Sequence, residues 1–68
     1  MKAEFKKRLL QIQKDLHELT QDHESWMEEH EDPNWEFSPS GEKASEENQE
    51  MCIALDYIQS ITQVELED

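Results

Sequence analysis

Apolar residues, continued by two histidines, recur along the first half of the chain at alternating steps of four and three residues. The positions are Phe5, Leu9, Ile12, Leu16, Leu19, His23, Trp26 and His30. This is a heptad pattern, which places these side chains on one stripe of an α-helix. Glu4 with Arg8, and Lys14 with Glu18, add oppositely charged pairs four residues apart. The pattern predicts one helix over about residues 3–29.

The first helix should end at Asp32-Pro33, because proline lacks a backbone N–H and disfavours helical geometry in the residue before it. Pro39 and Gly41 follow within a short distance. We therefore expect a loop over about residues 31–40.

A second helix is expected over about residues 42–64. Its N-cap is either Ser38, with Pro39 as the first helical residue, or Ser40. At 100° per residue, its apolar side chains cover an arc of roughly 200°, wider than the arc of a helix with one buried side. They are Met51, Ile53, Ala54, Leu55, Tyr57, Ile58, Ile61 and Val64. Such a helix requires cover from two directions.

Two antiparallel helices of one chain cover only one side of each other, so the wide arc implies a further partner surface. We expect an all-α fold with a single domain over residues 1–68. In this fold a two-helix antiparallel hairpin dimerises into a four-helix bundle. The alternative is that a different protein covers the second helix. The residues expected in the core or the dimer interface are Leu9, Ile12, Leu16, Leu19, Trp26, Met51, Leu55, Ile58 and Ile61.

Charge is distributed unevenly along this chain, whose formal net charge is −12. Of its 18 acidic residues, all except Glu4 lie from Asp15 onward, where Lys43 is the only lysine or arginine. In a hairpin, the basic start and the acidic end of the chain should lie side by side and balance each other. The residues involved are Lys2, Lys6, Lys7 and Arg8, against Glu65, Glu67 and Asp68. The excess of negative charge is then concentrated at the loop end.

Several protein classes are excluded or disfavoured by composition. Cys52 is the only cysteine, so no disulfide forms within one chain, and we expect this residue to be a buried or half-buried filler. The single thiol and the absence of a signal-like start predict a cytoplasmic protein. No segment approaches the roughly 20 apolar residues of a membrane span. The strong negative charge disfavours direct binding to nucleic acid or a membrane surface.

Residue patterns for catalysis or metal binding are absent, so we expect no enzymatic activity, cofactor or metal. Acid pairs one turn apart, such as Glu28 with Glu31, arise by chance in so acidic a chain. The positions of His17, His23 and His30 lack the Glu-x-x-His spacing of metal sites in helical bundles. Carboxylates flank both His23 and His30, which fits two alternatives: a pH-responsive interface, or polar positions that set the helix register.

The acidic loop end indicates a function in protein binding. Trp26, Met27, Trp35 and Phe37 lie near the loop end and fit two alternatives. They form a small cap that closes the bundle, or they form an aromatic anchor within an acidic rim, the usual anatomy of an interaction hot spot. Carboxylates along a helical rod also present charge much as a nucleic-acid backbone does. Proteins that occupy nucleic-acid-binding grooves in this way are often small and often made by phages or mobile elements, and this chain resembles them in charge and size.

We therefore expect a non-enzymatic inhibitor or regulator that binds a basic, nucleic-acid-binding surface of a partner protein. The alternative is a structural or assembly subunit that docks permanently on another protein through its second helix. The residues expected to bind the partner are Glu28, Glu29, Glu31, Asp32, Trp35, Phe37, Glu42, Glu46 and Glu47.

Overall fold

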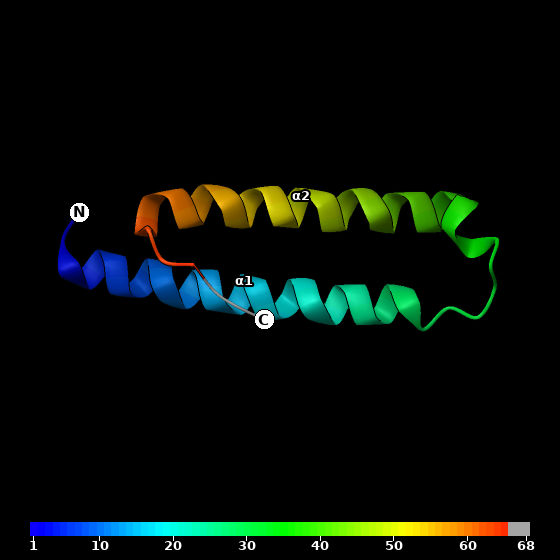
Figure 1. The fold of residues 1–68 in the computed structure, drawn as a ribbon, viewed down its shortest axis with the longest axis horizontal. Coiled ribbons are helices and arrows are strands. Elements are labelled where there is room, and N and C mark those ends of the chain that lie inside the picture. Colours follow the sequence, from blue (N-terminus) through cyan, green and yellow to red (C-terminus); the bar gives the residue numbers. More distant parts are fainter. Residues whose placement is uncertain (66–68) are drawn as a thin grey trace.

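Two antiparallel α-helices make up the fold in the computed structural model, which describes residues 1–65 (Figure 1). Helix α1 spans Ala3–Glu28 and helix α2 spans Pro39–Thr62, with one turn of 3-10 helix over Trp35–Phe37 in the connection. No strand occurs among the described residues. The predicted all-α hairpin is confirmed, and its dimerisation stays a prediction.

The hairpin is a rod with extents of 47 × 17 × 15 Å and a radius of gyration of 14.6 Å. A compact domain of this length would have a radius of gyration of about 11 Å. The accessible surface of 5639 Å² also exceeds the value of about 4,500 Å² expected for a folded monomer of this mass. A layer of two helices has little interior, so each helix is covered along one side only.

Helix α2 begins at Pro39, which is the earlier of the two starts that the sequence allowed, although its expected bounds placed the start near residue 42. Ser38 is its N-cap: the Ser38 Oγ accepts a hydrogen bond from the N–H of Gly41 at 3.1 Å. Pro39 takes the first helical position, where no N–H is required. Of the two possible caps, the chain uses Ser38 and not Ser40.

Replacing Ser38 by alanine should lower the free energy of unfolding by about 1 kcal/mol, because the Gly41 N–H loses its acceptor. Chemical denaturation measures this loss. The matched control is Ser40→Ala, at an exposed position of the same turn, which should change stability by less than about 0.5 kcal/mol. Equal losses in the two variants would contradict the assignment of the cap.

The end of α2 also differs from the prediction, since the helix stops at Thr62 rather than near residue 64. Gln63 adopts left-handed geometry with φ of 58°, and its N–H bonds to the carbonyl of Gln59 at 2.7 Å. This geometry turns the chain out of the helical path at Gln63.

A buried polar cluster joins the end of α2 to α1. The Thr62 hydroxyl donates to Gln13 Oε1 at 2.7 Å, and Gln13 Nε2 donates to the Val64 carbonyl at 2.7 Å. Gln13 and Thr62 are each only 1% exposed. Because both ends of the Gln13 amide are paired across the two helices, the cluster stabilises one register of the hairpin.

The contact between α1 and α2 is more polar than the heptad pattern predicts. The buried residues are Gln13, Thr20, Gly41, Ala44, Asn48 and Thr62. Of the residues expected in the core or dimer interface, one group is half-buried: Leu9, Leu16, Met51, Leu55 and Ile58. The other group is about half exposed: Ile12, Leu19, Trp26 and Ile61. The second group is not core in the single hairpin, because one partner helix covers only one edge of the stripe.

The basic start of the chain does not lie beside the end of α2 as predicted. Thr62 is placed against Gln13, so the first turns of α1 extend past the end of α2 (Figure 1). Glu65 lies back along α2, where it lines a hollow with Asp56 and Gln59. The charge balance predicted for this end is therefore wrong for Glu65, and Glu67 and Asp68 lie outside the described residues.

Candidate functional site

The connection between the helices is built from short-range hydrogen bonds that follow from its turn residues. Asp32 Oδ1 accepts from the N–H of Asn34 at 2.9 Å, and the Asp32 carbonyl accepts from the N–H of Trp35 at 3.0 Å. The Trp35 carbonyl then accepts from both the N–H and the hydroxyl of Ser38. This chain of turns brings Trp35 back under the end of α1.

An aromatic cluster closes the loop end of the hairpin. The rings of His30 and Trp35 are stacked, with centroids 3.6 Å apart and an interplanar angle of 12°. Trp26 meets both of them edge-on, with centroids 5.1 Å from His30 and 5.6 Å from Trp35. Trp35 is thus half-buried within the fold, whereas Trp26 is 48% exposed and Phe37 is 76% exposed.

His30 also caps the C-terminus of α1. Its Nδ1 lies 3.1 Å from the carbonyl oxygen of Trp26 and 3.3 Å from that of Met27. Carbonyl oxygens only accept hydrogen bonds, so Nδ1 carries the proton in this arrangement. His30 therefore satisfies carbonyl groups that the helix leaves free at its end. His23 differs, because its buried Nδ1 has no hydrogen-bond partner in the described structure.

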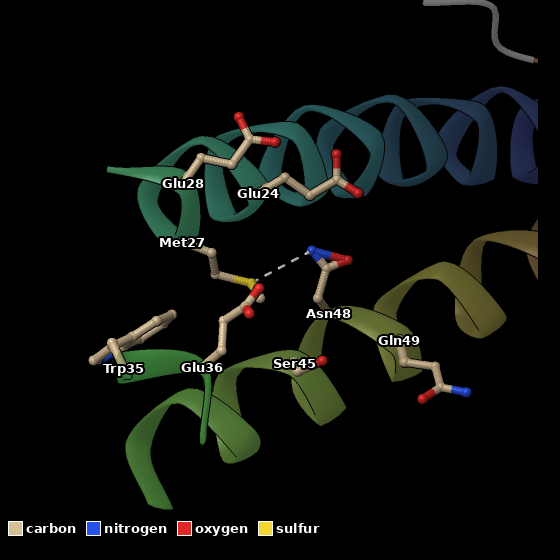
Figure 2. A pocket seen from close by; sticks show the side chains of 8 residues that line it. All are labelled: Glu24, Met27, Glu28, Trp35, Glu36, Ser45, Asn48 and Gln49. Atoms are coloured by element: carbon tan, nitrogen blue, oxygen red, sulfur yellow. Dashed lines mark hydrogen bonds between the residues drawn. The ribbon is translucent and has the colours of Figure 1, made fainter. Parts of the chain in front are cut away.

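A hollow of about 470 Å³ lies at the loop end between α1, the connection and α2 (Figure 2). Three carboxylates contribute to its lining: Glu24 and Glu28 from α1, and Glu36 from the connection. The remaining lining residues are Met27, Trp35, Ser45, Asn48 and Gln49. The hollow therefore combines a carboxylate rim with an apolar surface supplied by a thioether and an indole ring.

Asn48 fixes the α2 side of this hollow. It is 8% exposed, and its Nδ2 points at the sulfur of Met27 at 3.9 Å. Its Oδ1 accepts from the thiol of Cys52 at 3.6 Å. Cys52 itself is exposed, so the expectation that it fills a buried position is wrong.

The residues expected to bind a partner lie in three different places in the structure. Glu28 and Trp35 line the hollow. Glu47 lies on the other face of the hairpin, where it lines a separate hollow with His23 and Trp26. The others are exposed around the loop end and line neither hollow: Glu29, Glu31, Asp32, Phe37, Glu42 and Glu46. Their roles stay predictions.

Several residues of the hollow were missing from the sequence-based set, notably Glu24, Glu36, Met27 and Asn48. The sequence does indicate Glu24, because it precedes Glu28 by four residues and therefore lies on the same side of α1. No signal pointed to Asn48. Its place opposite Met27 depends on the register of the two helices, and a heptad pattern on one helix does not determine that register.

Comparison with protein-family models, with curated proteins and with solved structures finds no match to this chain. Within residues 1–65, no three histidine, cysteine, aspartate or glutamate side chains are placed to hold a metal ion. No helix of the described part is long and apolar enough to cross a membrane. The function must therefore be inferred from the surface itself.

Proposed function

We propose that this protein is a non-enzymatic inhibitor or regulator that binds a basic, nucleic-acid-binding surface of another protein through its loop end. The observation that carries the proposal is the hollow whose lining includes three carboxylates, Glu24, Glu28 and Glu36, together with Met27 and Trp35. This combination of charge and apolar surface suits a lysine or arginine side chain, whose aliphatic stem packs on apolar atoms while its charged end meets carboxylates.

The surroundings of the hollow support a macromolecular partner rather than a small molecule. The hollow is open to solvent, whereas small-ligand sites enclose most of the ligand surface. Phe37 projects from the same connection and offers an apolar anchor. Lys43 is the only lysine or arginine among the many carboxylates of this end, so the local field would steer a basic surface toward it.

Neutralising the hollow should weaken partner binding by at least about tenfold, since removing charges around a bound cation costs on the order of 1 kcal/mol or more. The variant is Glu24→Gln with Glu28→Gln and Glu36→Gln. Partners are captured with the immobilised protein at low salt and identified by mass spectrometry. Affinities of the captured proteins are then measured at 0.1 M and 1 M salt, between which the screening length falls from about 10 Å to about 3 Å.

The matched control changes the same number of charges away from the loop end, in Glu18→Gln with Asp56→Asn and Glu65→Gln, and should bind as the unmodified protein does. Duplex DNA should displace the partner, because the proposal places both ligands on one basic site. Salt-insensitive capture, or equal losses in the two triple variants, would contradict the proposal.

Self-association is the second part of the proposal: two hairpins complete each other as a homodimeric four-helix bundle. The half-exposed apolar side chains of α1 and Ile61 of α2 support it. The competing function, a structural subunit docked permanently on a different protein, is favoured by Ile53 and Tyr57 of α2, which are also exposed. Analytical ultracentrifugation with circular dichroism separates the two: a folded dimer of the purified chain supports the bundle, and an unfolded or aggregated chain supports the permanent subunit.

A further inference from the structure

One face of the hairpin carries an uncovered apolar stripe along α1. Its members lie seven residues apart, and a step of seven returns to nearly the same side of an α-helix. They are Phe5, Ile12, Leu19 and Trp26, which are 48–55% exposed. These are the alternate positions of the heptad pattern that α2 leaves uncovered, so the stripe extends over most of the length of α1.

Helix α2 continues the same face. Glu47 lines a hollow with His23 and Trp26, which places Glu47 on the side of the hairpin that carries the stripe. Ala54 and Ile61 follow Glu47 at steps of seven and share this side. The apolar face, defined as Phe5, Ile12, Leu19, Trp26, Ala54 and Ile61, therefore includes α1 and the second half of α2. In the first half of α2 this side carries Ser40, Lys43 and Glu47.

The opposite face of the hairpin is polar. A hollow of about 300 Å³ on that face is lined mainly by polar side chains of both helices, among them Gln21 and Glu24 of α1 and Asp56 and Gln59 of α2. The loop-end hollow shares Glu24 with it and so belongs to the same side. Covering the apolar face would leave this acidic side open.

The excess accessible surface of the hairpin is as large as the area that one partner buries in a protein interface. The accessible surface exceeds that expected for a folded monomer of this mass by on the order of 1,000 Å². A specific interface buries about 800 Å² on each partner. A second, equally amphipathic hairpin laid face to face would supply a surface of that extent.

Charge decides how a second copy would be oriented. Arg8, Asp15, Asp22 and Glu29 follow one another at steps of seven along one edge of the stripe. If the two loop ends lay together, the carboxylates of this edge would gather at one end and repel each other. If the loop ends lie apart, α1 runs antiparallel to the partner's α1. The basic first turns of each chain, with Lys2, Lys6 and Arg8, then approach the partner's acidic end.

We propose that a second copy of this chain covers the apolar face, with α1 antiparallel to the partner's α1 and the two loop ends at opposite ends of the dimer. The inference rests on the self-association proposed above and adds the surface and the orientation. In this dimer, the part of α1 that extends beyond α2 places the basic first turns over the partner's carboxylates. The loop-end hollow of each copy stays accessible on the outer side.

The surface is tested by Leu19→Glu against Ile53→Glu in ultracentrifugation of the full chain. The two side chains are similarly exposed, at 54% and 46%, but Ile53 lies on the side of α2 away from the buried positions 44, 48 and 62. Leu19→Glu should weaken the dimer by at least about 100-fold, because it buries a pair of unpartnered carboxylates. Ile53→Glu should weaken it less than about threefold. Equal effects, or weakening by Ile53→Glu alone, would overturn the assignment of the surface.

The orientation is tested without disturbing the apolar face. A spin label at Ser45→Cys, in a Cys52→Ser background, sits near the loop end on the polar side. With the loop ends apart, the two labels should be about 40 Å from each other, at 1.5 Å of helix rise per residue from a dimer axis near the middle of α1. With the loop ends together, they should be within about 20 Å.

The outcomes separate this inference from the proposals on which it rests. A dimer with the long label distance supports the inference. A dimer with the short distance overturns the orientation and leaves self-association intact. A folded monomer overturns both. Partner capture at the loop end is a separate measurement, so its failure would leave this result unchanged.

Discussion

Replacing Gly41 by alanine should destabilise the hairpin by about 1–3 kcal/mol, the range for inserting atoms where no space exists. A methyl group at this position would meet the carbonyl oxygen of Trp35 and would lie 2.8 Å from the carbonyl carbon and 3.0 Å from the Cα of Glu36. These are backbone atoms, held by the hydrogen bonds from Ser38 to the Trp35 carbonyl. They cannot move aside as the end of a long side chain can.

The expected loss of stability is informative, because helix propensity alone would make the alanine variant more stable by about 1 kcal/mol. Urea denaturation at fixed protein concentration measures the change, and Ser60→Ala, at an exposed position of the same helix, is the control. Tryptophan fluorescence should shift as well, since displacing the connection disturbs the stack of Trp35 on His30. A Gly41→Ala protein as stable as the unmodified one would show that the connection does not approach α2 this closely.

Thr62→Val should cost about 1–3 kcal/mol, although valine has nearly the same shape as threonine. The loss of the hydroxyl leaves Gln13 Oε1 buried without a donor and removes the acceptor for the N–H of Val64. A buried polar group that loses its partner retains the full cost of its desolvation.

The Gln13–Thr62 pair can be tested by a double-mutant cycle with Gln13→Leu. The double variant should lose less stability than the two single changes together, with a coupling of about 0.5–3 kcal/mol. Thermal unfolding followed by circular dichroism gives all four values at equal concentration. Additive effects would mean that the two residues do not depend on each other, and the hairpin register would then need another cause.

The heptad pattern predicted α1 well because the spacing of its apolar residues is a local property of one helix. It did not show which half of the pattern faces α2. The packing places Gln13, Thr20 and Met27, one turn beyond Leu9, Leu16 and His23, toward the partner helix, and leaves Phe5, Ile12, Leu19 and Trp26 outside. Which side of α1 faces α2 depends on the surfaces of both helices, so the pattern of one helix cannot predict it.

The candidate site was located only coarsely by the sequence. The excess of acids near the loop was visible from their positions. The sequence did not show which of them line one hollow, because the path of the connection brings Glu36 to the hollow that Glu24 and Glu28 line. Trp35 was expected to contact a partner, and the turns from Asp32 to Ser38 place its ring against His30. The predicted exposure of an aromatic anchor applies to Phe37.

The sequence by itself determined two helices, the break at Asp32-Pro33 and the strongly acidic character of the loop end, because periodicity, proline chemistry and charge act locally or add along the chain. Tertiary structure decided the register through the buried Gln13–Thr62 pair. That register in turn extends the basic first turns of α1 past the end of α2 (Figure 1). It also separates an apolar face from an acidic one. Such properties arise only when two surfaces pack together, since burial and pairing belong to the contact between helices and not to either helix alone.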